Sequence, residues 1–435
     1  MSERTRELLA LVPASLLVTA GFTAVYIQRE DIVSDASLVV GGVFLGLCLA
    51  VHLVLRFTLP HADPYLFPLV ALLACYGLVM IYAIDEEFAR AQAQWFVVGL
   101  AAFAATVIWL RRDYRVLEDY RYVIATAGIV LLLLPRLSPP VNGAYLAFRI
   151  GPISFQTAEL AKICIVVFLA SYLRDTRQML VTGGRRVLGF GLPPLRVLGP
   201  LLAVWGAAML MLFVIQDIGS SLMFFGGFLA VLYVATNRLS FVLVGLALFA
   251  LGARVLYALR PTIERRVDAW QDPFDPQLYD AVGGSYQLAQ SLFAQADGGV
   301  LGEGFGQSLI RLPGGDQILP AAHTDFIYAV ITNELGLAGA CGVILVYLLV
   351  VQRGFKVALL APDSFSKLLA AGLTAVFALQ VFVIVGGVVK LIPLTGVTLP
   401  FVSYGGSSIV ANFILLALLL LISDRARREG REGAR

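Results

Sequence analysis

The stretch DPYLFPLVALLACYGLVMIYAI, residues 63–84, decides the fold class of this chain. Residues 65–84 carry no charge, and a helix of about 20 apolar residues crosses the roughly 30 Å hydrocarbon core of a bilayer. Similar runs recur along the sequence. We predict an all-α, polytopic membrane protein with about twelve transmembrane helices, near residues 8–27, 37–58, 65–84, 92–110, 122–135, 158–173, 197–215, 219–236, 240–258, 325–351, 366–390 and 407–423.

The composition of the 435-residue chain agrees with this fold class. Hydrophobic residues make up 59% of it and charged residues only 14%, whereas a soluble domain carries about 25% charged residues. This argues against a water-soluble enzyme, and the abundant apolar surface argues against disorder. The net charge of +3 is too small to indicate a nucleic-acid partner. The four cysteines lie in apolar runs and are interpreted as small buried hydrophobes.

The distribution of arginine predicts how the chain is oriented in the membrane. The connection RRDYRVLEDYR (residues 111–121), the connection after the sixth span and the C-terminal tail are basic, whereas the connections after the first and third spans are acidic. Twelve spans put every basic segment on one side, which is the cytoplasmic side by the positive-inside rule. We therefore expect both termini in the cytoplasm, with the N-terminal run retained as the first span of a cell-membrane protein.

One long connection, residues 259–324, falls on the outer face and is expected to fold onto the membrane domain. It contains four aspartates within thirteen positions: Asp268, Asp272, Asp275 and Asp280. Two of them precede proline, which holds a carboxylate on a stiff, non-helical turn. Spacing alone fits two interpretations: a solvated loop rich in turns, or a carboxylate that takes a proton or binds a cation at the membrane surface.

Several ionisable residues fall within or at the ends of the predicted spans, where they are costly unless they face a bundle interior or an aqueous cavity. They are Glu159, Lys162, Asp217, Asp325, Glu334 and Lys390. Glu159 and Lys162 are three residues apart and share a helix face. Each residue fits a structural ion pair or an interfacial position, but as a set they favour a polar cavity that opens to the outer face.

The stretch LIPLTGVTLPFVSYGGSS, residues 391–408, leads into the last span. Gly-Gly-Ser-Ser at a helix start leaves free backbone N–H groups, which suit an anion such as a phosphate. The other interpretation is a re-entrant turn that packs between spans. Irregular backbone at membrane depth must be buried in protein or line a cavity, so both interpretations predict a cavity here.

Three blocks of the sequence resemble signature blocks of the SEDS (shape, elongation, division, sporulation) family: LTGVTLPFVSYGGSS at 394–408, HTDFIYAVITNELG at 323–336 and GPISFQTAELAK at 151–162. QDIGSS and GGSYQLAQSLFAQADGGVLGEGFG resemble two further blocks. The resemblance implies a ten-span membrane domain at residues 65–424, with a catalytic outer loop at 259–324. It also implies an additional two-helix segment at 1–64 and a basic cytoplasmic tail at 425–435. The QDIGSS variant and the additional spans favour the elongation branch over the division branch.

The resemblance further implies a peptidoglycan glycosyltransferase that polymerises lipid II on the outer face of the cytoplasmic membrane and releases undecaprenyl diphosphate. Its expected partner is a class B penicillin-binding protein, a transpeptidase. The family's essential aspartate matches Asp275, which would act as the general base. Because this sequence has one residue fewer between its Asp-Pro pairs and extra residues before Gly284, Asp272 and Asp280 stay as alternatives.

The remaining site residues are expected around that aspartate. Cationic groups would hold the diphosphates, and polar groups would line the cavity; the candidates are Lys390, Arg311, Lys162, Glu159, His323, Asp325, Thr398, Ser403, Gly405 and Ser407. A divalent cation, Mg²⁺ or Mn²⁺, could bridge the aspartate and a diphosphate, since hard cations favour oxygen ligands.

Two other function classes fit the buried charges. One is a transporter that flips lipid II across the membrane, although the sequence shows none of the inverted repeats that many transporters have. The other is a non-catalytic scaffold of the elongation or division machinery.

Overall fold

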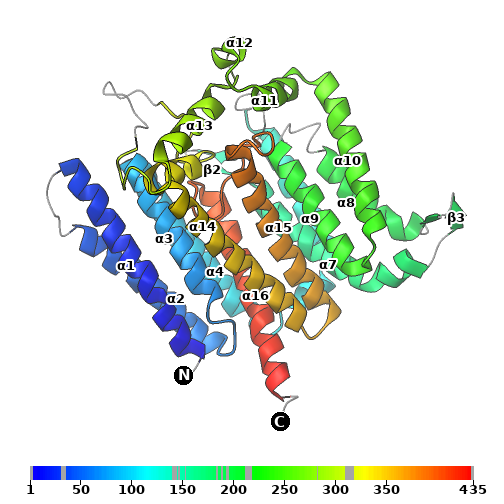
Figure 1. The fold of residues 1–435 in the computed structure, drawn as a ribbon. Coiled ribbons are helices and arrows are strands. Elements are labelled where there is room, and N and C mark those ends of the chain that lie inside the picture. Colours follow the sequence, from blue (N-terminus) through cyan, green and yellow to red (C-terminus); the bar gives the residue numbers. More distant parts are fainter. Residues whose placement is uncertain are drawn as a thin grey trace.

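The structure is a computed structural model that describes residues 3–30, 36–139, 145, 147–151, 153–182, 185–187, 190–192, 195–210, 218–281, 283–308 and 318–432. The described chain is almost entirely helical (Figure 1). A helix lies at each of the twelve predicted spans: α1 (Glu3–Glu30), α2 (Ala36–Thr58), α3 (Leu66–Ile84), α4 (Glu86–Leu110), α6 (Arg121–Leu133), α7 (Ala158–Thr182), α8 (Leu195–Leu210), α9 (Ile218–Thr236), α10 (Leu239–Leu259), α14 (Ile327–Leu360), α15 (Ser364–Val388) and α16 (Gly406–Glu432).

The connections contain the shorter elements. Helix α5 spans Val116–Asp119, and the 3₁₀ helix η1 (Leu134–Leu137) follows α6. Strands β1 (Phe148–Ile150) and β2 (Ile153–Phe155) form an antiparallel hairpin in which Arg149 is opposite Ser154, and β3 (Arg185–Val187) pairs in the same way with β4 (Phe190–Leu192). The outer connection is not a simple loop, because it folds into α11 (Pro261–Gln271), α12 (Pro276–Tyr279) and α13 (Tyr286–Gly298).

Nine of the described helices are long and apolar enough to cross a membrane, which confirms the polytopic class. The other three predicted spans fall on α6, α7 and α8. Helix α6 has only 13 residues, and α8 is described for 16 residues up to Leu210. Helix α7 is long enough but carries Glu159 and Lys162 near its start and further charges near its end. The count of twelve stays a prediction.

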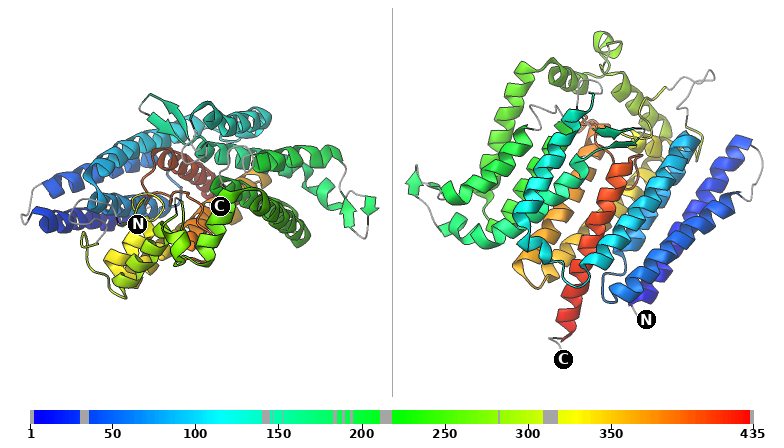
Figure 2. Two further views of the ribbon diagram at one scale, coloured as in Figure 1. Left: turned by 90° about the horizontal axis from the view of Figure 1, so that it is seen from above. Right: turned by 180° about the vertical axis from the view of Figure 1, so that it is seen from behind.

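Helix α16 lies in the middle of the bundle, and the two added helices lie at its edge (Figures 1 and 2). The apolar part of α16 is buried almost throughout, in contact with α4, α14, α7 and α15. Its Phe413 ring packs edge-on against Phe96, Phe103 and Phe401. Helix α10 at the opposite edge has no buried residue in its apolar stretch. Burial therefore falls from α16 outward, as expected for a helical membrane bundle whose outer faces meet lipid.

Helix α1 packs against both α2 and α3, and α2 also contacts α4. The Sγ of Cys75 in α3 lies 3.1 Å from the carbonyl oxygen of Ala14 in α1. A Cβ on Gly21 would lie 2.7 Å from a methyl carbon of Val79, so glycine permits the close approach of the two helices. The two chain ends lie at the same end of the molecule, opposite α12 (Figure 1).

The segment before α16 packs directly on the backbone of α3. A Cβ on Gly77 would lie 2.5 Å from the carbonyl oxygen of Val402 and 2.6 Å from its Cα. Neither atom can move without moving the buried turn. Gly77 therefore fixes where this turn sits against the bundle.

We predict that Gly77→Ala lowers the melting temperature of the detergent-solubilised protein, because overpacking a buried contact costs about 1–3 kcal/mol. Tryptophan fluorescence during heating measures the effect. Gly46→Ala in α2 is the matched control, since a Cβ there meets nothing within 4 Å. Equal melting temperatures for the two variants would contradict this role of Gly77, because the turn would then accommodate the added methyl group without a loss of stability.

Candidate active site

The segment between α15 and α16, residues 389–405, is irregular and largely buried at its centre. Lys390 and Phe401 have positive φ values of 61° and 65°, a backbone conformation that costs non-glycine residues about 1–3 kcal/mol. The hydroxyl of buried Tyr347 donates to the carbonyl oxygen of Pro400 at 2.6 Å, and Phe401 packs against Phe377 and Phe413. The predicted irregular turn is thus held inside the protein, as membrane-depth backbone requires.

A buried chain of polar groups connects α7, α15 and this segment. Lys162 donates from Nζ to Glu159 Oε2 at 2.6 Å and to Gln380 Oε1 at 2.6 Å. Gln380 then donates from Nε2 to the carbonyl oxygen of Thr398 at 2.9 Å. All four residues are less than 9% exposed. Glu159 and Lys162, which the sequence places on one helix face, form an ion pair, and Gln380 couples this pair to the irregular segment. We call these four residues the polar chain.

The hydroxyl of Ser403 both donates and accepts a hydrogen bond, and these two bonds hold the irregular segment in place. Its Oγ donates to the carbonyl oxygen of Thr324 at 2.7 Å and accepts from the backbone N–H of Leu399 at 2.9 Å. Gln92 of α4 donates to the carbonyl oxygen of Ser403 at 3.1 Å and accepts from the backbone N–H of Gly405 at 3.2 Å. Ser403 and Gly405 therefore lie where α4, α16 and the segment before α14 meet.

The start of α16, which the sequence predicts as an anion site, contacts other segments of the protein in this structure. The Oγ of Ser407 accepts from the backbone N–H of Gln156 at 3.1 Å. Gly406 faces the Trp95 indole so closely that a Cβ would lie 2.2 Å from it. With Gly405 bonded to Gln92, a phosphate at this helix start would have to replace protein contacts.

His323 and Asp325 lie beside the same segment. The backbone N–H of Tyr404 donates to the carbonyl oxygen of His323 at 2.8 Å, and the imidazole stacks on Phe88 with 4.0 Å between ring centroids. A Cβ on Gly396 would lie 3.5 Å from Asp325 Oδ2. These two predicted residues are thus brought to the irregular segment, each half-buried.

Helices α11, α12 and α13 form a cap over the ends of α14 and α15, on the side away from the termini (Figure 1). Trp270 donates from Nε1 to the carbonyl oxygen of Lys390 at 3.1 Å, and Gln295 donates to that of Val388 at 3.1 Å. Asn333 of α14 donates to the carbonyl oxygen of Ala294 at 2.8 Å. Half-buried Lys390 therefore lies at the junction between the cap and the bundle.

The three candidate aspartates lie on the outer part of the cap. Asp275 is half-buried and caps α12, its Oδ1 accepting from the backbone N–H of Gln277 at 2.8 Å. Asp272 is exposed and accepts from the N–H of Phe274 at 3.3 Å, and Asp280 is exposed. Helix α12 stands above the other cap helices (Figure 1). Among the described residues no hydrogen bond or ion pair joins Asp275 to the polar chain.

Asp275 is nevertheless tied to the bundle through the chain. It lies five positions after Trp270, whose indole bonds to Lys390. An extended chain spans at most about 3.6 Å per residue, roughly 18 Å over these five steps. The Phe274 ring packs on Phe293 of α13, with 5.5 Å between centroids. Two further candidates, Arg311 and Asp217, lie outside the described residues.

The sequence analysis missed several residues that hold the site together. The side-chain amides of Gln92 and Gln380 link segments far apart in the chain. Their signal was an amide within or beside an apolar run, since a polar group at bilayer depth requires a partner. Glu334, one of the charges predicted within the spans, is fully buried and accepts hydrogen bonds from the N–H of Gly306 (3.1 Å) and Ser308 Oγ (2.7 Å). These contacts anchor the end of the cap to α14.

No metal ligand set is assembled by the protein alone in the part of the chain that the structure describes. Groups of three or more histidine, cysteine, aspartate or glutamate side chains close enough to hold an ion do not occur there. The arrangement can instead supply one lysine–glutamate pair, backbone and hydroxyl dipoles of the irregular segment, and the carboxylates of the cap. The Thr398 hydroxyl is buried without a hydrogen-bond partner among the described residues, so it is available to a ligand.

The fold and the site define a polytopic helical membrane protein with a buried charged chain beneath a helical cap. Residues 64–428 match the model of the family described as "Cell cycle protein", which covers FtsW, RodA and SpoVE. This match covers most of the sequence, and the chain belongs to this family. The resemblance seen in the sequence blocks is thereby confirmed.

Relatives and solved structures agree with this assignment. The chain is 41% identical to the peptidoglycan glycosyltransferase RodA of Mycobacterium tuberculosis over 98% of its own length and 92% of that protein. It is similar to a chain of a peptidoglycan synthase complex that coordinates polymerization and crosslinking, with 27% identity and a TM-score of 0.66, covering 84% of this chain and 98% of that one. It is also similar to Thermus thermophilus RodA, with 26% identity and a TM-score of 0.58, covering 83% and 96%.

We predict that Glu159→Gln destabilises the protein strongly, because it leaves the buried Lys162 ammonium without a counter-charge, at a cost of about 3–5 kcal/mol. The double variant Glu159→Gln/Lys162→Met removes both charges and should recover much of the lost stability. Thermal unfolding in detergent measures both effects.

Glu86→Gln provides the matched control, since Glu86 pairs with Arg90 at 2.5 Å on the surface, with side chains 50% and 74% exposed. An exposed pair contributes at most about 1 kcal/mol. A Glu159→Gln variant as stable as Glu86→Gln would contradict the structural role of the buried pair.

Proposed function

We propose that this chain is a peptidoglycan glycosyltransferase that polymerises lipid II into glycan strands and releases undecaprenyl diphosphate. The observation that carries the proposal is the 41% identity, over nearly the full length, with a mycobacterial peptidoglycan glycosyltransferase. A buried charged chain at the irregular segment, close to the cap junction, supports it, since such groups at membrane depth favour a functional site.

In this reaction a sugar hydroxyl of one lipid-linked unit attacks the anomeric carbon of another, and the polyprenyl diphosphate leaves. The diphosphate is a good leaving group that needs cationic stabilisation more than a proton donor. The attacking hydroxyl needs a base within hydrogen-bond reach. One carboxylate with nearby cations is sufficient, unlike the two carboxylates of glycoside hydrolases.

We assign the general base to Asp275 and the diphosphate contacts to Lys390 and Lys162, with Arg311 as a further cation. The cap linkage supports the first assignment, because Asp275 is tethered within about 18 Å of the Trp270–Lys390 junction. The buried Thr398 hydroxyl adds a donor within the polar chain. For Asp275 to reach a sugar held there, α12 must move toward the bundle or the substrate must extend into the cap.

The basic connections support an orientation in which the cap lies on the extracytoplasmic face and both termini lie in the cytoplasm. Residues 1–64 are an addition to the family domain. The partner is a class B penicillin-binding protein, as suits a chain similar to one in a complex that both polymerises and crosslinks. A Mg²⁺ or Mn²⁺ ion would take most of its oxygen ligands from the diphosphates, and Asp275 would supply one.

We predict that Asp275→Asn lowers lipid II polymerisation by at least about 100-fold, because a general base contributes about 10²–10⁴-fold to the rate. The assay uses purified protein in detergent, where substrate is accessible without transport, and follows glycan chain length on a gel. Asp272→Asn and Asp280→Asn are the controls and should retain most activity.

Full activity in the Asp275 variant with loss of activity in one of the controls would instead assign the general base to the aspartate changed in that control. Wild-type protein that makes no glycan in detergent, yet moves lipid II between leaflets of reconstituted vesicles, would instead favour a transporter.

We also predict that Trp270→Phe slows polymerisation while leaving the melting temperature nearly unchanged. The phenyl ring keeps the apolar contact, but the hydrogen bond to the Lys390 carbonyl oxygen is lost, which loosens the cap at the junction. Trp109→Phe is the control, since Trp109 is 81% exposed on α4. Equal polymerisation rates for the two variants would show that this hydrogen bond does not contribute to catalysis.

A further inference from the structure

A hollow of about 640 Å³ lies at the end of the molecule that carries both termini. Ligand sites commonly measure about 300–1,000 Å³. Its wall is built by the first turns of α1, the end of α2, the connection to α3 and Arg431 near the end of α16. Only Leu8 and Pro60 are apolar among the lining residues. This lining suits a charged ligand rather than an apolar one.

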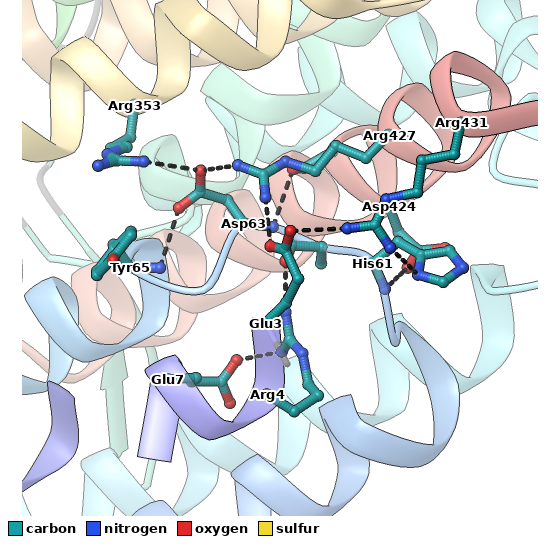
Figure 3. Close-up of polar contacts among 12 residues, drawn as sticks. Glu3, Arg4, Glu7, His61, Asp63, Tyr65, Arg353, Asp424, Arg427 and Arg431 are labelled. Carbon is teal, nitrogen blue, oxygen red and sulfur yellow. Dashed lines mark hydrogen bonds and ion pairs between the residues drawn. The ribbon is translucent and has the colours of Figure 1, made fainter. Parts of the chain in front are cut away.

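The wall is rigidly built, because ion pairs link its segments (Figure 3). Glu3 accepts from Arg427 at 2.6 Å and from Arg431 at 2.9 Å. Asp424 accepts from the backbone N–H of His61 at 2.8 Å. These contacts hold the start of α1, the connection before α3 and the end of α16 in one arrangement.

The charge on this wall is positive. Four arginines line the hollow against one carboxylate, Glu3. Glu3 is already bonded to arginine, whereas Arg6 and Arg56 are exposed and form no ion pair with another described residue. Two cations therefore remain uncompensated at one concave site.

A buried donor lies in the same wall. Arg4 is only 6% exposed, and its terminal nitrogens donate to Glu7 and to the carbonyl oxygen of Ala62. Its Nε is buried with no hydrogen-bond partner among the described residues. An unsatisfied buried donor costs about 1–3 kcal/mol, which an anion in the hollow could recover. This observation is independent of the surface charges.

We propose that this hollow binds a phosphate-bearing anion. Guanidinium groups match phosphate oxygens in geometry and charge, and a phosphate carries enough negative charge to balance Arg6 and Arg56. The phosphate can belong to a free diphosphate or to an anionic phospholipid. A lipid would find apolar surface directly beside the hollow, where Leu53 and Phe57 of α2 are 50% and 78% exposed. The inference does not depend on the proposed enzymatic function.

The test uses the full-length protein in neutral detergent and measures binding by native mass spectrometry and by the shift in melting temperature. The probes are inorganic pyrophosphate, phosphatidylglycerol and zwitterionic phosphatidylcholine. The variant is Arg6→Gln/Arg56→Gln, which changes exposed residues and should fold normally. The matched control is Arg111→Gln/Arg112→Gln, an exposed pair of arginines directly after α4 that does not line the hollow.

We expect the wild type to bind pyrophosphate or phosphatidylglycerol in preference to phosphatidylcholine, and the Arg6/Arg56 variant to bind at least about tenfold more weakly, since charged hydrogen bonds contribute about 1.5–3 kcal/mol. The control should bind as the wild type does. Loss confined to pyrophosphate identifies a free ligand, and loss confined to phosphatidylglycerol identifies a lipid. Binding that does not distinguish the probes, or equal loss in variant and control, overturns the proposal.

Discussion

The ammonium group of Lys162 is the constraint on which the arrangement of the site depends. It is buried among apolar helices, and such a charge is tolerated only when paired and hydrogen-bonded. Glu159 supplies the charge and Gln380 the additional acceptor. Because these partners come from α7 and α15, satisfying one lysine fixes how two helices pack. Gln380 also donates to the Thr398 carbonyl oxygen, which ties the irregular segment to the same two helices.

In the irregular segment it is the backbone N–H and C=O groups that need partners, because they lack the regular hydrogen bonds of a helix. They are satisfied by side chains from elsewhere, such as Gln92 and Tyr347. Glycine also matters here, because Gly77 lets α3 come close to the backbone of Val402. The segment is therefore irregular but not loose, and its shape is imposed by the helices around it. This makes it a suitable place for chemistry that needs fixed dipoles.

The cap and the polar chain are coupled through backbone contacts rather than through their charged groups. Trp270 and Gln295 bond to carbonyl oxygens at the end of α15, which leaves the Lys390 side chain available. Asp275 is the N-cap residue of α12, and α12 stands above the other cap helices (Figure 1). The cap contacts found at this junction therefore involve neither Glu159 nor Lys162. The ionic cluster around Asp63 and Arg427 stabilises the other end of the bundle in a separate way.

The sequence by itself determined the fold class, the positions of the long apolar helices and the family, because apolar runs and ordered motif blocks are local properties of the chain. It also placed Glu159 and Lys162 on one helix face, since residues three apart share a face. Only the tertiary structure decided that Gln380, Gln92 and Ser403 join that pair to the irregular segment. It also decided that Asp275 caps α12 away from the pair. These contacts join residues far apart in the chain, and no local pattern specifies which side chain a buried polar group will meet.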